Sequence, residues 1–142
     1  REGAVEKVKT FLGRHYSLVG KVVKGHRIGH DLGYPTVNIN PIDANKLIPS
    51  IGVYICWIII NSKIYQSVTN IGYSPTLKKT GIMEVETHIL DFKGDIYGDE
   101  VEVVFLKKIR EELIFPDRAA LIEAIGSDIH TAREYFSQNK EN

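Results

Sequence analysis

The chain has 142 residues, 43% apolar and 25% charged, a composition typical of one globular domain and not of a disordered chain. Its 18 Lys and Arg residues balance 18 Asp and Glu residues, and this zero net charge argues against nucleic-acid binding by bulk charge and against a polybasic membrane anchor. The longest apolar run, residues 51–60, is about half as long as a membrane-spanning helix. The single cysteine, Cys56, lies in this run and is expected to be a buried, reduced thiol in a reducing compartment, which predicts the cytoplasm.

The first expected element is a short amphipathic helix in residues 1–13. Val5, Val8 and Leu12 fall on one stripe, and Gly13 follows as a stop signal. We expect residues 1–13 to be a linker helix from an upstream domain and residues 14–142 to form the main domain.

After Ser17 the pattern changes to short strands separated by turns. The residues between 52 and 60 are apolar and β-branched on both faces, so both faces of this strand are expected to be buried. Asn61 and Ser62 form a two-residue turn that predicts a hairpin with the next strand. Six short strands favour an antiparallel closed barrel, which leaves no exposed edge. The expected strands are residues 18–23, 36–39, 52–60, 63–71, 83–90 and 101–106.

The C-terminal segment is expected to be an α-helix that packs on the barrel. Asp117 is a plausible N-cap for it. Apolar residues recur at helical spacing and predict one buried stripe. The stripe consists of Leu121, Ile125, Ile129, Ala132 and Phe136. The predicted fold is therefore mainly β, a six-stranded antiparallel closed barrel with a C-terminal helix.

A glycine-rich segment precedes two polar residues that are suited to phosphate and metal binding. Gly25, Gly29 and Gly33 lie close together, and Thr36 and Asn38 follow at a spacing of two. On a strand this spacing puts both side chains on one face, where their oxygens suit Mg²⁺, while glycine-rich backbone can approach phosphate. The alternative is a long hairpin loop followed by an ordinary polar strand.

A second candidate is the polar face of the strand at residues 83–90. Glu84, Glu86 and His88 alternate with apolar residues and project from one face. This face is either solvated or lines a polar cleft. Glu86 can act as a general base only if the cleft is present.

Two further patterns could suggest a zinc site or a base-binding surface, but neither interpretation is favoured. His26 and His30 have the spacing of metal ligands only on a helix, and the glycines around them argue against a helix and a zinc site. Tyr54 and Trp57 lie in the long apolar strand and are expected in the core, not as a platform for bases.

Several ordered blocks of the sequence resemble the riboflavin kinase family. The first block, residues 25–38, ends in Gly33-Tyr34-Pro35-Thr36-Val37-Asn38, which is similar to the family's Gly-Phe-Pro-Thr-Ala-Asn. The later blocks are Gly52-Val53-Tyr54, then Asn70-Ile71-Gly72 with Pro75-Thr76, then Glu86-Thr87-His88 with Leu90-Asp91-Phe92 and Asp95-Ile96-Tyr97-Gly98, and finally Arg110, Glu112 and Phe115, with Asp128 and Ala132 in the last helix. The resemblance covers nearly the whole chain from Gly13 on.

The resemblance implies an enzyme that transfers the γ-phosphate of ATP to the ribityl 5′-hydroxyl of riboflavin, giving FMN and ADP. It implies that Glu86 accepts the hydroxyl proton and that Thr36 and Asn38 hold Mg²⁺, the expected cofactor of ATP, together with the nucleotide phosphates. The other implied nucleotide-binding residues are Gly25, His30, Gly33 and Tyr97, and those implied to border the flavin are Arg110, Leu113 and Phe115.

The start of the chain also resembles known proteins, whereas one position in the glycine-rich segment departs from the family. Residues 12–18 resemble the junction in bacterial bifunctional FAD synthetases, so we expect a preceding FMN adenylyltransferase domain in the native chain. Tyr34 and Val37 replace the family's usual Phe and Ala harmlessly. His30, however, occupies a position that is usually Arg or Lys, where a fixed positive charge faces phosphate. Arg27 is the alternative source of that charge.

Two other function classes compete with the kinase. The first is a non-catalytic barrel that binds flavin or nucleotide, which the intact Thr36, Asn38 and Glu86 argue against. The second is an oligonucleotide-binding barrel, which the zero net charge and the lack of aromatic pairs flanked by Lys or Arg argue against. The expected partners are thus riboflavin and ATP, with no nucleic acid and no membrane.

Overall fold

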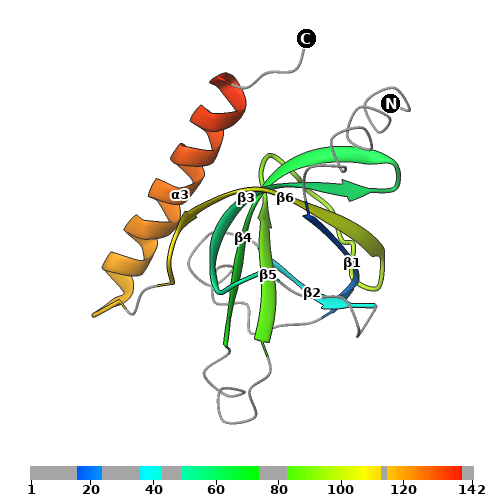
Figure 1. The fold of residues 1–142 in the computed structure, drawn as a ribbon, viewed down its shortest axis with the longest axis horizontal. Coiled ribbons are helices and arrows are strands. Elements are labelled where there is room, and N and C mark those ends of the chain that lie inside the picture. The colour runs from blue at the N-terminus through cyan, green and yellow to red at the C-terminus, as the bar shows by residue number, and fades with distance from the viewer. Residues whose placement is uncertain (1–15, 24–35, 43–48, 74–82, 113–114, 139–142) are drawn as a thin grey trace.

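A computed structural model describes residues 16–23, 36–42, 49–73, 83–112 and 115–138. The elements in these residues are β1 (Tyr16–Val23), β2 (Val37–Pro41), β3 (Gly52–Ile60), β4 (Lys63–Tyr73), β5 (Met83–Ile89), β6 (Glu100–Arg110) and α3 (Arg118–Gln138) (Figure 1). Each strand expected from the sequence is present, and so is the C-terminal helix. The helix expected at residues 1–13 lies outside the described residues.

The six strands form a closed antiparallel barrel in the order β1-β2-β5-β4-β3-β6. Closure comes from the pairing of β1 with β6, in which Tyr16 is opposite Phe105 and Lys21 is opposite Glu100. Every strand therefore has two neighbours, and the barrel has no open edge. The predicted fold class is confirmed.

The β3–β4 hairpin forms at the turn that the sequence predicted. Asn61 and Ser62 both have positive φ angles, 51° and 67°. Two consecutive left-handed residues make the kind of tight turn whose twist matches that of the flanking strands. The pairing continues from Ile60 opposite Lys63 to Gly52 opposite Ile71, so the long apolar strand is fixed in register over its whole length.

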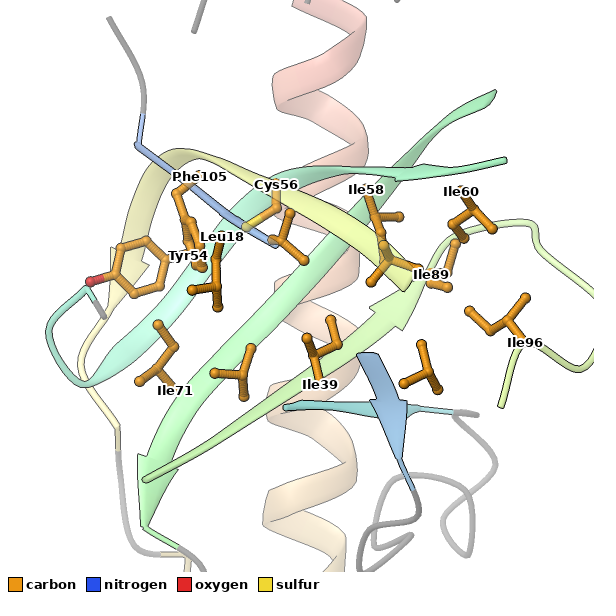
Figure 2. Close-up of a cluster of buried hydrophobic side chains, with 14 residues drawn as sticks. Leu18, Ile39, Tyr54, Cys56, Ile58, Ile60, Ile71, Ile89, Ile96 and Phe105 are labelled. Atoms are coloured by element: carbon orange, nitrogen blue, oxygen red, sulfur yellow. The ribbon is translucent and has the colours of Figure 1, made fainter. Parts of the chain in front are cut away.

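The barrel interior is filled by apolar side chains, which Figure 2 shows converging from the surrounding strands. Tyr54 packs its ring edge against Phe105 with the centroids 5.2 Å apart, as expected for a core residue. Cys56 is fully buried beside them, and this burial raises the pKa of its thiol to about 12. The expectation of a buried thiol is confirmed.

A second apolar cluster joins the outer face of the barrel to α3. Val53 and Ile55 of β3 pack there with Ala132 and Phe136 of the helix. The ring of Trp57 stacks on that of Phe136, with the centroids 6.5 Å apart. Strand β3 is therefore buried on both faces, as predicted, with the barrel interior on one side and the helix on the other.

Helix α3 stands against one side of the barrel (Figure 1) and is docked unevenly along its length. Its first turn is capped by Asp117, whose Oδ1 accepts a hydrogen bond of 2.8 Å from the Ala120 backbone N–H. The buried residues of the helix, Asp128, Ala132 and Phe136, lie between its midpoint and its last turn. Nowhere in the described part of the chain is there a helix long and apolar enough to cross a membrane.

Candidate active site

A cavity of about 210 Å³ lies between the first half of α3 and the outer face of the barrel. Because this half of the helix buries no residue against the strands, space remains beneath it. The apolar wall of the cavity consists of Val53, Val68, Phe115, Leu121, Ile125 and Ile129, and the polar wall of Thr36, Asn70, Glu86, His88, Arg110, Glu112 and Asp128. An apolar slot with a few convergent polar groups is typical of a site for a small aromatic ligand.

Glu86 is placed at this cavity by strand β5. Its neighbour across one ladder is Asn38 of β2, and its neighbour across the other is Asn70 of β4. Glu86 and His88 are half-buried and line the cavity, whereas Glu84 is not among the lining residues. The cleft that a basic role for Glu86 requires is therefore present. The alternative of a solvated strand face is wrong for Glu86 and His88.

One hydrogen bond links Glu86 to the segment that follows the glycine-rich residues. The Thr36 hydroxyl donates a hydrogen bond of 2.6 Å to Glu86 Oε2. Because the hydroxyl proton points at the carboxylate, the lone pairs of Thr36 Oγ1 remain available to a cation or another donor. The short bond holds the carboxylate in one orientation at the edge of the cavity.

Thr36 and Asn38, which both lie next to Glu86, offer oxygen atoms of the kind that Mg²⁺ prefers. Asn38 is buried, at 7% exposure, and stands directly across from Glu86 in the ladder, as expected for the strand face that the sequence predicted. No cluster of three or more His, Cys, Asp or Glu side chains suited to a metal occurs among the described residues. A hydroxyl and an amide oxygen nonetheless suit Mg²⁺, which usually keeps several water or phosphate ligands.

A second, larger cavity of about 730 Å³ adjoins this site. It shares Thr36 and His88 with the first cavity. Asp91, Phe92, Lys93 and Gly94, from the segment after β5, also line it. Two hollows with common wall residues beside the Thr36–Glu86 pair can hold two ligands whose reacting ends meet there.

Tyr97 lies in an exposed turn near the end of β1. Its side chain is 59% exposed, and its backbone N–H donates to Asp95 Oδ1 at 3.0 Å. The next residue, Gly98, donates from its N–H to the Val22 carbonyl at 2.9 Å, which fixes the turn to β1. Because Val23 pairs with Asn38, Tyr97 lies at the same end of β1 as the candidate metal ligands, although it lines neither cavity.

Arg110 and Phe115 both line the first cavity, and the side chain of Arg110 is already bonded within the chain. Its Nε and one terminal nitrogen donate to the two carboxylate oxygens of Asp128 at 2.9 and 2.8 Å. Its other terminal nitrogen donates to the Glu111 carbonyl at 3.1 Å, and the guanidinium lies 5.6 Å from the centroid of the Phe115 ring. The predicted site residues Gly25, His30, Gly33 and Leu113 lie outside the described residues, as do His26 and Arg27.

For some residues of the cavity, no individual role was predicted from the sequence. Asn70 entered only as part of a family block, and Leu121 and Ile125 only as part of a buried stripe. Glu112 packs so closely over Gly72 that a Cβ on this glycine would overlap the Glu112 carboxylate. The alternation along residues 63–71 could have placed Asn70 on the outer face, but nothing local indicates that Glu112 reaches across to β4.

Comparison with known proteins identifies the family. The family model described as "Flavokinase: Riboflavin kinase" matches residues 12–136. The chain belongs to the riboflavin kinase family. A relative from Listeria monocytogenes, named bifunctional riboflavin kinase/FMN adenylyltransferase, is 34% identical over 137 residues, which cover 96% of this chain and 43% of the relative. The chain thus spans less than half the length of the curated relatives it matches.

Two solved structures share the fold. Riboflavin kinase from Trypanosoma brucei has a TM-score of 0.62 and 25% identity, covering 87% of this chain and 81% of that one. A Streptococcus pneumoniae protein solved as a macrolide-efflux protein has a TM-score of 0.78 and 31% identity, covering 92% of this chain and 42% of that one. The name of the second structure refers to transport, but the family match and the Listeria and Trypanosoma names agree on riboflavin kinase.

Proposed function

We propose that this chain transfers the γ-phosphate of ATP to the ribityl 5′-hydroxyl of riboflavin, giving FMN and ADP. Membership of the riboflavin kinase family supports the substrate pair. The observation that carries the proposal is the 2.6 Å hydrogen bond between Thr36 and Glu86 at the edge of an apolar cavity. It brings a carboxylate and a candidate metal ligand to the point where the two cavities adjoin.

In the proposed reaction Glu86 accepts the proton of the 5′-hydroxyl. The freed oxygen forms a bond to the γ-phosphorus while the bond from that phosphorus to the bridging oxygen of ADP breaks. Thr36 Oγ1 and Asn38 Oδ1 would hold Mg²⁺ with the nucleotide phosphates. When bound, the ion neutralises phosphate charge, and this is the main demand of phosphoryl transfer beyond positioning.

We assign the flavin to the smaller cavity and the nucleotide to the larger one. The apolar walls and the Phe115 ring suit an isoalloxazine, and we propose Arg110, Leu113 and Phe115 as its borders. For the nucleotide we propose Gly25, His30, Gly33 and Tyr97, with Thr36 common to both ligands. The anchoring of the Tyr97 turn to β1 supports this side of the assignment.

We further propose that residues 14–142 are the kinase module of a longer enzyme. The relatives carry FMN adenylyltransferase in their names, so we propose this activity for a preceding domain in the native chain. The single buried thiol of Cys56 supports a reducing compartment, and we propose the cytoplasm.

The test is incubation of the purified chain with riboflavin and Mg-ATP, followed by chromatography for FMN and ADP. We expect equimolar FMN and ADP. Riboflavin or ATP binding without any FMN would instead identify the non-catalytic barrel. An absence of binding to either ligand would contradict both functions.

A further inference from the structure

The side-chain oxygen of Asn70 is a buried acceptor to which none of the described residues donates a hydrogen bond. Asn70 lines the smaller cavity from strand β4. Its Oδ1 atom is inaccessible to solvent, and it accepts no hydrogen bond from any described residue. Buried side-chain oxygens in folded proteins are nearly always paired, so this exception requires a physical reason.

The register of β4 fixes the face and the neighbours of Asn70. Thr69 and Ile71, the residues on either side, are fully buried, and Ile71 belongs to the core of the barrel interior. Side chains alternate along a strand, so Asn70 faces outward into the cavity. Its neighbour in the ladder with β5 is Glu86, and directly opposed side chains have Cβ atoms about 5 Å apart. Asn70 is therefore the direct neighbour of Glu86, whose carboxylate is proposed to accept the substrate proton.

An unpaired buried carbonyl destabilises the ligand-free protein, because it has lost its hydrogen bonds to water and gained none in return. The penalty disappears when the amide turns toward the cavity and meets a donor that a ligand brings there. Asn70 Oδ1 is neutral and only accepts, so the matching group is an O–H or N–H and not a phosphate or a carboxylate.

We propose that Asn70 Oδ1 accepts a hydrogen bond from an inner hydroxyl of the ribityl chain and so holds the terminal hydroxyl against Glu86. This inference rests on the proposed function. Riboflavin carries donors at the ribityl hydroxyls and at the ring N–H. The ribityl chain ends at the reacting 5′-hydroxyl, whereas the ring N–H is at the opposite end of the molecule. Because Asn70 is opposite Glu86, its donor lies within a few bonds of the reacting oxygen, which selects an inner ribityl hydroxyl.

The experiment compares two ligands on two proteins. The first ligand is riboflavin, and the second is an isoalloxazine whose side chain is 5-hydroxypentyl, which keeps the ring and the terminal hydroxyl but lacks the inner hydroxyls. We expect Asn70→Ala to weaken riboflavin binding by about 10-fold, measured by quenching of flavin fluorescence, since one buried hydrogen bond is lost. Binding of the hydroxypentyl analogue should be the same in both proteins. Gln66→Ala removes an exposed side-chain amide from the same strand and is the matched control, with both affinities unchanged.

The outcomes separate this inference from the proposed function. An equal loss of affinity for both ligands would assign Asn70 to the ring or to the terminal hydroxyl and overturn the inference, while FMN formation by the wild type would still stand. If the wild type binds no riboflavin, the proposed function itself fails.

Stability of the ligand-free protein gives a second readout that needs no flavin. Asn70→Leu replaces the unpaired amide by an apolar group of similar size, so we expect its thermal midpoint to rise by a few degrees while riboflavin affinity falls. A fall in the midpoint of both Asn70→Leu and Asn70→Ala would show that the oxygen is satisfied in the empty protein, and this would overturn the inference.

Discussion

The hydrogen bond between Thr36 and Glu86 joins two residues whose proposed roles can each be tested by a single substitution. Glu86 is half-buried, and its carboxylate is held by a hydroxyl from another segment of the chain. Alternation along residues 83–90 was enough to put Glu86 on the outer face of a strand. The hydrogen bond to Thr36 could not be predicted from alternation, because it depends on the pairing of β2 with β5.

Replacing the base tests its role directly. Glu86→Gln keeps the size of the side chain but removes its ability to accept a proton, so kcat for FMN formation should fall by about 10²-fold or more. Riboflavin affinity should change little, since the cavity walls remain. Glu84→Gln, on the same strand but outside the cavity lining, should keep normal turnover. Steady-state kinetics of both variants would reject the assignment if Glu86→Gln turned over normally.

The proposed metal ligands are tested by their dependence on Mg²⁺. Thr36→Ala and Asn38→Ala each remove one oxygen, so ATP binding followed by calorimetry should require a higher Mg²⁺ concentration, and kcat should fall. Thr36→Ser keeps the hydroxyl and should behave nearly as the wild type does. Unchanged Mg²⁺ dependence in both alanine variants would show that the ion binds elsewhere.

At the scale of elements, locally encoded features were predictable. The Asn61–Ser62 turn and the Asp117 cap depend on neighbouring residues, and both form where expected. The stripe on α3 was correctly identified, but its two halves differ in role. Ala132 and Phe136 pack on the barrel, whereas Leu121 and Ile125 line a cavity. Periodicity identifies an apolar face and does not tell whether protein or ligand covers it.

The helix is tied to the barrel by the ion pair between Arg110 and Asp128, at the boundary between those two halves. Only 24% of the Arg110 side chain and 10% of the Asp128 side chain are exposed, so removing one partner leaves the other charge poorly solvated. We expect Asp128→Asn to lower the free energy of unfolding by about 2 kcal/mol, and the double variant with Arg110→Gln to lose less than the sum of the two single losses.

Urea denaturation measures these losses, and the fluorescence of the single tryptophan reports on the docking of the helix. Trp57 stacks on Phe136 of α3, so its emission should shift if the helix loosens. Arg133→Gln is the matched control, because it breaks the exposed pair of Arg133 with Asp91 on the same helix. Exposed pairs contribute little, so its loss should be much smaller. Equal losses in the two cases would refute a special role for the Arg110–Asp128 pair.

At the scale of the whole molecule, the sequence predicted a closed barrel but not its strand order. Short alternating strands favour closure in general, and the family resemblance implied six strands. The pairing of β1 with β6 joins residues about as far apart as the barrel allows, and no local pattern specifies it. The cavity depends on that order, since its walls come from four strands, from Thr36 just before β2, from the segment after β6 and from the helix. Residues of this cavity such as Glu86 and Arg110 could therefore be singled out one by one from the sequence, whereas their meeting at one cavity could not be predicted.

The closed barrel also makes a prediction about pH through Cys56. Its thiol is fully buried, and burial raises its pKa from the ordinary 9.0 to about 12, although contacts with Thr69 and Leu106 act in the opposite direction. Between these two values the unfolded chain loses the thiol proton and the folded protein keeps it. The folded state then binds more protons than the unfolded state, so stability must fall as pH rises through this range.

The free energy of unfolding should consequently fall by about 1.4 kcal/mol more in the wild type than in Cys56→Ala between about pH 8 and about pH 10. Other groups titrate in the same range, but they are common to both proteins and cancel in the comparison. Urea denaturation at the two pH values gives the difference, and a thiol reagent should modify Cys56 only as fast as the protein unfolds. Parallel pH profiles, or immediate modification of the folded protein, would show that the interior of the barrel is open to water.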